Sequence, residues 1–471
     1  MKGPTVVALG SLALGVLTVF ACGPDAPSLY KGSSSGTSGT SSGEENDGGS
    51  SGSSGTSGTS GTSGGSSGTT DAGVKSFPFT PKTTCDAPKR VVDYGAGEGA
   101  AGVNLAGAAG SPLALTWART SGSDTGPCEL RLWDGAAFAT PNVLATSCRA
   151  PRGRQLAAGG GAATVMATSP GTSSNGRRAR ANGTTWTALL PVTNRPLPDS
   201  AFVRVGAGGH TMEVWSTGND MHVGLAAPAA TALTELPVVD TGKISGAIGG
   251  VIGATGDGFG FWANGSTQLT ARAFKNGAWV GSQGNPAPAV AAVEPEIHAV
   301  PLPNGDAYVV WGTSSLNGSP VRFDGASTVF GALDTITNAG SFALGNGEHL
   351  VATPDGELTL VFASAGAILK GTRKVGAAAW SAPVDLGPFV GTPSITVDAS
   401  GHVTAVRATN DGQVFHHRVA KGSTTWSPAV RVDAATGAGA GGPAGVGVDA
   451  ATGNPVFAWS AGGDVWFTVC R

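Results

Sequence analysis

Charge is scarce in this sequence, and helical patterning is nearly absent. Charged residues make up 13 % of the 471 residues, and 28 Lys and Arg stand against 31 Asp and Glu, for a net charge of -3. Neutralising nucleic-acid phosphates needs a concentrated basic face, so we expect no nucleic-acid partner. Helical spacing of apolar residues is essentially missing beyond residue 84, which leaves short strands as the expected elements.

The chain also lacks a run of about 20 apolar residues, the length that a transmembrane helix needs. The uncharged stretch at residues 6–20 is shorter and follows Lys2, a pattern typical of a signal peptide. It ends in Val19-Phe20-Ala21-Cys22, which resembles the lipobox of bacterial lipoproteins. The alternative is a plain secretory signal with a coincidental cysteine.

The lipobox resemblance implies an export signal and a lipid anchor. It implies that residues 1–21 are removed as a signal peptide and that Cys22 carries the lipid. The residue after this cysteine is Gly rather than the Asp associated with inner-membrane retention. We therefore expect an outer-membrane lipoprotein of the cell envelope, on the periplasmic or the surface face. Several acyl chains would anchor it stably, since each buried methylene contributes about 0.8 kcal/mol.

Residues 22–71 are predicted to form a tether. From residue 33 to residue 70 the chain is almost wholly Ser, Gly and Thr. Such a segment has nothing to bury, so it is expected to remain disordered. A Gly/Ser coil of about 40 residues spans roughly 35 Å, which lifts a domain clear of the lipid headgroups.

Residues 72–471 are predicted to form one all-β domain built from repeats. A turn glycine is followed six residues later by a large residue on a strand, at intervals of 45–52 residues. The pairs are Gly160/Met166, Gly209/Trp215, Gly256/Trp262, Gly305/Trp311, Gly356/Phe362, Gly401/Arg407 and Gly453/Trp459, and Trp117 opens the series. Four short strands per repeat are the unit of a β-propeller blade. Eight anchors predict about eight four-stranded blades, or seven if the weak Met166 repeat is misassigned.

The ends of the domain predict how the ring closes. The last repeat offers only three strands before Arg471, whereas residues 84–93 align without gaps on the fourth-strand phrase around Trp426. An N-terminal strand that completes the last blade would close the ring and remove two exposed sheet edges. We call this expected strand the latch.

The cysteines agree with this closure. Besides Cys22, the chain has four, which allow three pairings. The latch brings Cys85 beside the strand that contains Cys470, while Cys128 and Cys148 belong to one repeat. We therefore predict the disulfides Cys85–Cys470 and Cys128–Cys148, which an oxidising compartment permits.

The repeat pattern resembles the sialidase-like, BNR-type and lectin-like propellers. It does so as architecture over residues 84–471. The Asp-box of that family, Ser-x-Asp-x-Gly-x-x-Trp, is not present, and only its tail survives, as in Gly183-Thr184-Thr185-Trp186. A sialidase-like site would imply three arginines, a Tyr–Glu pair and an acidic Asp.

No catalytic set meets those needs. None of Tyr30, Tyr94 and Tyr308 is expected beside a suitable Glu. General glycoside hydrolysis needs two facing carboxylates, but Asp and Glu occur mainly at turns, where they bond the backbone. His416 and His417 are neighbours on a strand and point to opposite faces, so they do not chelate together. We predict no catalytic residue, metal or cofactor.

Two further groups are expected to be structural. The run Arg177-Arg178-Ala179-Arg180 is placed on a third strand, as a charged edge that discourages edge-to-edge pairing. The repeated tryptophans are expected to pack between blades; they are Trp186, Trp215, Trp262, Trp311, Trp380, Trp426 and Trp459.

The predicted function is binding or scaffolding at the cell envelope, with a glycan or a protein as ligand and with the protein acting as a monomer. The alternative is an exo-acting glycoside hydrolase, or another hydrolase, with its site in the central channel. Facing carboxylates or arginines near the channel would favour the hydrolase, and exposed aromatic residues between blades would favour a lectin.

Overall fold

The computed structural model describes residues 76–471 except for short stretches. Those stretches are residues 96, 109, 122–124, 150–152, 168–176, 183–184, 191–200, 218–219, 240–243, 265–267, 287–296, 313–314, 338–341, 345–347, 365–367 and 435–443. The chain divides into two units, 1–68 and 69–471, and every described residue lies in the second. The predicted signal peptide, the acylated Cys22, the tether and residues 72–75 of the predicted domain lie outside the described residues.

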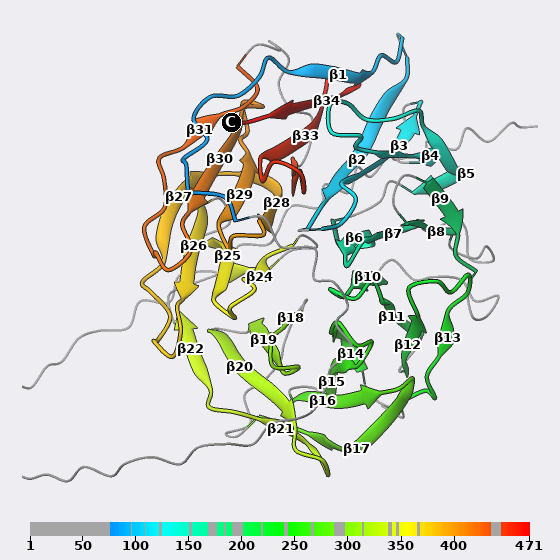
Figure 1. Cartoon of the computed structure of the whole chain (residues 1–471), viewed down its shortest axis with the longest axis vertical. Helices are drawn as coiled ribbons and strands as arrows, with labels where there is room; N and C mark the ends of the chain where they lie inside the picture. Colours follow the sequence, from blue (N-terminus) through cyan, green and yellow to red (C-terminus); the bar gives the residue numbers. More distant parts are fainter. Residues whose placement is uncertain are drawn as a thin grey trace, which may run out of the picture. The chain divides into compact units, whose positions relative to one another are not determined.

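Eight antiparallel sheets form a ring, which makes the second unit an eight-bladed β-propeller (Figure 1). Blades 1 to 4 contain β2 (Gly99–Ala106), β3 (Ala114–Thr120), β4 (Thr125–Leu132) and β5 (Asn142–Arg149); β6 (Leu156–Gly159), β7 (Ala162–Ala167), β8 (Arg177–Asn182) and β9 (Thr185–Ala188); β10 (Phe202–Val205), β11 (Thr211–Thr217), β12 (Asp220–Ala226) and β13 (Thr234–Glu235); and β14 (Ile244–Ile252), β15 (Gly258–Asn264), β16 (Gln268–Lys275) and β17 (Ala278–Gly284).

Blades 5 to 8 follow the same plan with small departures. They contain β18 (His298–Pro301), β19 (Ala307–Gly312), β20 (Leu316–Phe323), β21 (Thr328–Phe330) and β22 (Asp334–Thr337); β23 (Phe342–Ala343), β24 (Leu350–Ala352), β25 (Leu358–Ser364), β26 (Ile368–Lys374) and β27 (Val384–Pro388); β28 (Val390–Val397), β29 (Val403–Ala408), β30 (Val414–Val419) and β31 (Val430–Arg431); and β32 (Gly445–Val448), β33 (Pro455–Ala461), β34 (Asp464–Val469) and β1 (Lys89–Val92). Both β21 and β22 pair with β20, and both β23 and β24 pair with β25.

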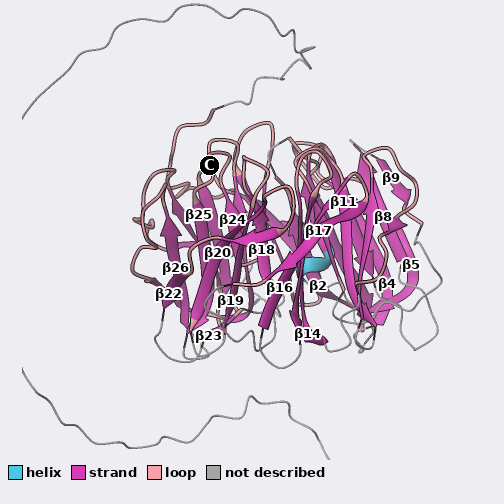
Figure 2. Ribbon diagram, turned by 90° about the horizontal axis from the view of Figure 1, so that it is seen from below, coloured by secondary structure: helices cyan, strands magenta, loops and turns pink. Residues whose placement is uncertain are grey.

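The first strand of each blade lies at the centre of the ring. β6 contacts β2 and β10, β14 contacts β10 and β18, β24 contacts β18 and β28, and β32 contacts β28 and β2. Seen from the side, the strands run between two loop-bearing faces (Figure 2). The described part of the chain contains one short 3-10 helix, η1 (Gly153–Gln155), and no helix long and apolar enough to cross a membrane.

The predicted period is confirmed blade by blade. The turn glycines all have positive φ, between 51° and 87°, a region that glycine enters without steric cost. The eight anchor residues all lie on the second strand of their blades, and all are buried, including Met166 of the weakest repeat. Blade 2 is therefore a complete blade, and the seven-blade alternative is wrong.

The latch is also confirmed. β1 pairs antiparallel with β34, with Lys89 opposite Phe467 and Arg90 opposite Trp466. Cys85 and Cys470 form a disulfide across this junction. Ahead of the latch, residues 77–82 cross blades 7 and 8, where Arg418 donates to Thr80 O at 2.6 Å.

The seams between blades combine apolar packing with buried polar contacts. In blade 7, for example, Trp426 is 8 % exposed and lies against Gly371 and Leu386 of blade 6. Trp279 Nε1 donates to Pro237 O of the preceding blade at 2.7 Å. Among the repeated tryptophans, the Trp426 contact confirms the predicted packing between blades, as does Trp380, whose Nε1 donates to Tyr308 Oη of blade 5 at 3.0 Å.

Candidate functional site

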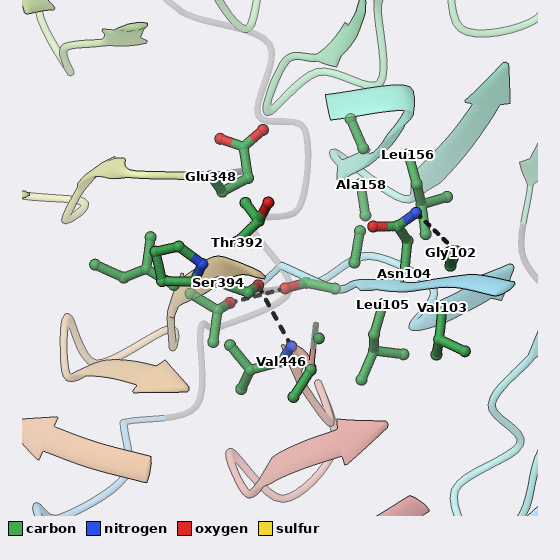
Figure 3. Close-up of a pocket in the computed structure, with 18 of the residues that line it drawn as sticks. Gly102, Val103, Asn104, Leu105, Leu156, Ala158, Glu348, Thr392, Ser394 and Val446 are labelled. Carbon is green, nitrogen blue, oxygen red and sulfur yellow. Dashed lines mark hydrogen bonds between the residues drawn. The ribbon is translucent and has the colours of Figure 1, made fainter. Parts of the chain in front are cut away.

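A cavity of about 910 Å³ lies at the centre of the ring (Figure 3). Its walls come from the first strands of blades 1, 2, 3, 6, 7 and 8 and the residues beside them. Those walls include Ala101–Ala108, Leu156–Ala158, Arg204, Val205, Glu348, Val351, Thr392–Val397 and Ala444–Val446, together with Thr125 and Arg149 of blade 1. No described residue of blade 4 or blade 5 contributes to this lining.

Small residues and two bulges in the first strands shape the cavity. A Cβ on Gly445 would lie within 2.9 Å of Leu105 atoms, so the central strands approach too closely for a larger residue there. The register of β2 shifts between Ala101 and Asn104, and that of β28 shifts between Val390 and Ser394. Bulges of this kind redirect side chains.

The bulged segments place polar side chains on the cavity wall. The side chains of Asn104, Thr392 and Ser394 line it (Figure 3). The Asn104 amide donates to Gly102 O at 3.0 Å, and the Ser394 hydroxyl accepts from the Val446 amide at 3.4 Å. The orientation of Asn104 and Ser394 is thus fixed by contacts with the backbone.

Two contacts cross the channel between blades that are not neighbours. Arg204 of blade 3 pairs with Glu348 of blade 6, with Nη1 and Oε1 at 2.5 Å. Arg154 of blade 2 donates from Nη2 to Ile297 O, beside blade 5, at 3.1 Å. These contacts bound the cavity on the side of blades 4 and 5.

Neighbouring groups stabilise the charged side chains of Arg154 and Glu348 at this boundary. The Arg154 guanidinium lies over the Phe202 ring, 4.1 Å from its centroid. Burial alone would raise the pKa of Glu348, but Arg204 and Arg154 outweigh it and lower the pKa of this carboxyl below its ordinary value. Glu348 is therefore ionised and can accept hydrogen bonds at neutral pH.

Behind this boundary lies a pair of histidines. His298 is 1 % exposed, and its ring centroid lies 5.0 Å from that of His349. Burial and the nearby Arg154 lower the pKa of His298 well below its ordinary value. His298 is therefore neutral at physiological pH and adds no charge to the cavity.

Close contacts join the first strands of blades 7, 8 and 1 along the cavity wall. The Thr396 hydroxyl of blade 7 donates to Gly107 O of blade 1 at 3.1 Å, although blade 8 lies between these blades in the ring. A Cβ on Gly107 would lie 2.5 Å from Leu113 Cδ1 and 3.2 Å from Val448 O. The first strands thus meet closely here.

The residues singled out in the sequence lie away from the cavity. Cys128 and Cys148 form the second disulfide, within blade 1, so both disulfides have the pairing that the repeats predict. None of these four cysteines is among the described lining residues. His416 and His417 lie on β30, the third strand of blade 7, away from the axis.

The expectations for Tyr94 and for the arginine run are both wrong. Tyr94 does lie beside a glutamate: its hydroxyl donates to Glu129 Oε1 at 2.9 Å and accepts from Trp117 Nε1 at 2.7 Å. The sequence could not show this contact, because it joins the end of the latch to blade 1. The group is buried between blades 8 and 1, with Tyr94 9 % exposed, and it is not part of the cavity.

The arginine run is not a charged edge. It does form the third strand of blade 2, β8, as expected, but Arg178 and Arg180 are buried. Arg178 forms an ion pair with Glu213 of blade 3, and Arg180 donates to Ala227 O at 2.6 Å. These side chains join neighbouring blades instead of protecting an edge.

Sequence analysis missed the charged residues of the cavity, although one signal was present. Five residues before the turn glycine, several repeats carry Val, as at Val251, Val300, Val351 and Val448, whereas blade 3 carries Arg204. The remaining repeats carry the uncharged residues Ala106, Gln155 and Thr396 there, so Arg204 is the one charged side chain at this position, which suggests a local function. The partner, Glu348, has no comparable signal.

The fold and the axial cavity define the class of protein as an eight-bladed β-propeller with a central cavity. No protein-family model matches the chain, and no curated protein matches it. Among solved structures, the BP39L lectin from Burkholderia pseudomallei is similar, with a TM-score of 0.46 and 15 % identity over 70 % of this chain and 99 % of that one.

Two further solved structures are similar to this chain, with lower TM-scores. AofleA from Arthrobotrys oligospora has a TM-score of 0.41 and 10 % identity, over 75 % of this chain and 95 % of that one. TolB from Acinetobacter baumannii has a TM-score of 0.36 and 11 % identity, over 70 % and 80 %. At these levels the similarities do not indicate a ligand for this chain.

Proposed function

We propose that the chain is an outer-membrane lipoprotein, anchored through Cys22, whose propeller binds a saccharide in the central cavity. The signal sequence and its lipobox-like end support the anchor, and the Ser/Gly/Thr-rich segment supports display on a tether. The observation that carries the binding proposal is the cavity itself. Its volume of about 910 Å³ falls in the range of roughly 300–1,000 Å³ that is usual for small-ligand sites.

The chemistry of the walls suits a polyhydroxylated ligand. Sugar hydroxyls need both donors and acceptors, and the lining offers the guanidinium of Arg204, the amide of Asn104, the hydroxyls of Thr392 and Ser394, and the carboxylate of Glu348. Aliphatic side chains lie between these groups and suit the C–H faces of a sugar ring. A purely apolar ligand would displace water from these half-buried polar groups without offering them hydrogen bonds, which is costly.

Arginines near the channel count toward the hydrolase alternative, and Arg149 and Arg204 line the cavity, but the described lining has no facing pair of carboxylates. Hydrolysis by the general mechanism needs two carboxylates on opposite sides of the scissile bond. Among the described lining residues Glu348 is the one carboxylate, and it is paired with Arg204. The proposal is therefore a binding protein, and release of reducing sugar by the purified chain would contradict it.

The test is a glycan-array screen followed by calorimetry, using the full chain with Cys22→Ser to keep it soluble. Ala158→Phe places a ring in the cavity, whereas Val143→Phe adds the same ring on β5, where Val143 is 60 % exposed. We expect Ala158→Phe to weaken binding at least tenfold, or about 1.4 kcal/mol, and Val143→Phe to change it little. A flat array from folded protein, or equal binding by both variants, would refute a saccharide site in the cavity.

The anchor has its own test. In cells that produce the wild-type chain, mass spectrometry of the mature N-terminus should find an acylated Cys22 and the protein in the outer-membrane fraction. Cys22→Ser should move the protein to the soluble fraction. A wild-type N-terminus without lipid would contradict the anchor and leave the cavity proposal unaffected.

A further inference from the structure

A group of potential metal ligands lies at the latch, away from the cavity. Cys85, Cys470 and His416 each offer one ligand atom, and these atoms lie within 4.8 Å of one another. They come from three segments: the chain just before β1, the end of β34, and β30 of blade 7. In the structure the two sulfur atoms are bonded to each other, so they carry no thiolate.

The geometry of His416 sets this group apart from an ordinary disulfide. Its Nε2 lies 3.2 Å from Lys82 O, which identifies Nε2 as the protonated donor. The other nitrogen, Nδ1, is therefore unprotonated, and it is buried without a hydrogen-bond partner. The side chain is fully buried, and its ring stacks on Phe457 with 5.0 Å between centroids.

This arrangement matches what a metal-binding histidine requires. Histidines that bind metals usually donate their other N–H to a carbonyl or carboxylate, which fixes the tautomer and the ring. Here Lys82 O fills that role, and Phe457 holds the plane of the ring.

We infer that the reduced latch is a zinc site, with Cys85 Sγ, Cys470 Sγ and His416 Nδ1 as ligands. Two thiolates and an imidazole are a donor set that suits Zn²⁺. A dithiol opens the disulfide, which gives two thiols on this chain and a disulfide on the reductant. Zn²⁺ then binds the sulfurs as thiolates and displaces two protons.

The site would need little movement. Zn–S distances of about 2.3 Å place two tetrahedral sulfur ligands roughly 3.8 Å apart, so the sulfurs need to separate by about two ångströms. The β1–β34 ladder and the contacts of residues 77–82 hold the backbone on both sides. Zn²⁺ would then replace the disulfide as the cross-link that closes the ring.

The experiment uses the full chain with Cys22→Ser, Cys128→Ala and Cys148→Ala, which removes all other thiols. The protein is reduced with dithiothreitol, freed of it under anaerobic conditions, and titrated with Co²⁺ and then Zn²⁺. We expect a thiolate-to-cobalt band in the near-ultraviolet at one Co²⁺ per chain, displaced by Zn²⁺. The oxidised chain is the control and should show no band.

Replacing the histidine separates a designed site from two thiols that happen to bind metal. His416→Phe should weaken Co²⁺ binding at least about tenfold, and His416→Gln serves if the Phe variant does not fold. X-ray absorption of the zinc-loaded reduced chain, which needs no variant, should find two sulfur neighbours and an imidazole nitrogen. Absence of the cobalt band, equal binding without His416, or a zinc shell without imidazole would each overturn the inference.

Discussion

Removing the latch disulfide should cost more stability than removing the disulfide of blade 1. The two bonds differ chiefly in the loop that each closes: the cysteines of Cys85–Cys470 are 385 residues apart in sequence, and those of Cys128–Cys148 are 20 apart. If a disulfide acts by restricting the unfolded chain, the larger loop contributes more. The entropic relation gives about 6 kcal/mol for the long loop and about 3 kcal/mol for the short one.

The folded structure is expected to change little when either disulfide is removed. Without the disulfide, the latch retains backbone bonds on both sides, such as Asp86 N to Val469 O at 2.9 Å and Arg471 N to Thr84 O at 2.7 Å. The ring should therefore remain closed, and the loss should fall mainly on the unfolded chain. Truncating the paired sulfurs adds a similar packing cost to both variants, which cancels in the comparison.

The assay is guanidinium unfolding of Cys85→Ala/Cys470→Ala and Cys128→Ala/Cys148→Ala, followed by tryptophan fluorescence. We expect the free energy of unfolding to fall by about 2–3 kcal/mol more in the latch variant than in the blade 1 variant. Similar slopes against denaturant would show that both native states stay compact. An equal loss, or a larger loss in the blade 1 variant, would refute the account of the latch as a long-loop closure.

Two further predictions concern buried charge. Arg178→Met should destabilise the protein by about 3–5 kcal/mol, because it leaves Glu213 buried without its ion-pair partner. The double variant Arg178→Met/Glu213→Leu should recover most of that loss. Thermal or denaturant unfolding measures the stability of both variants. The folded pKa of His416, about 3, lies below the unfolded value near 6.5, so the unfolded state binds the proton first as the pH is lowered. The free energy of unfolding therefore falls by about 1.4 kcal/mol for each unit that the pH is lowered between those two values. His416→Phe should flatten this part of the stability–pH curve, and an unchanged slope would contradict the assignment.

Much of the architecture was predictable because a propeller repeats itself. Each blade repeats the same strands and buried anchor, and all but the first carry the turn glycine, so the interval between Trp215 and Trp262 already predicts two neighbouring blades. The latch and both disulfides follow from aligning the chain ends with one complete repeat. These features depend on contacts within a blade or between consecutive blades, which a one-dimensional period can express.

The contacts around the cavity were harder to predict from the sequence. Arg204 could be noticed as the one charge at a repeat position that is otherwise uncharged, but its partner Glu348 lies 144 residues away and three blades around the ring. The Tyr94–Glu129 contact and the burial of Arg178 were missed for a related reason. Each depends on how one blade faces another.

The sequence alone therefore determined the blade and its closure and limited the number of blades to seven or eight, since strand alternation, turn glycines and paired cysteines are local or periodic properties. The tertiary structure decided which residues meet at the axis and at the latch. Closing eight blades into a ring brings together side chains from blades that are not neighbours, such as Arg154 and Ile297, and it sets His416 beside the Cys85–Cys470 bond. No repeat period contains that information, because these contacts break the symmetry of the ring.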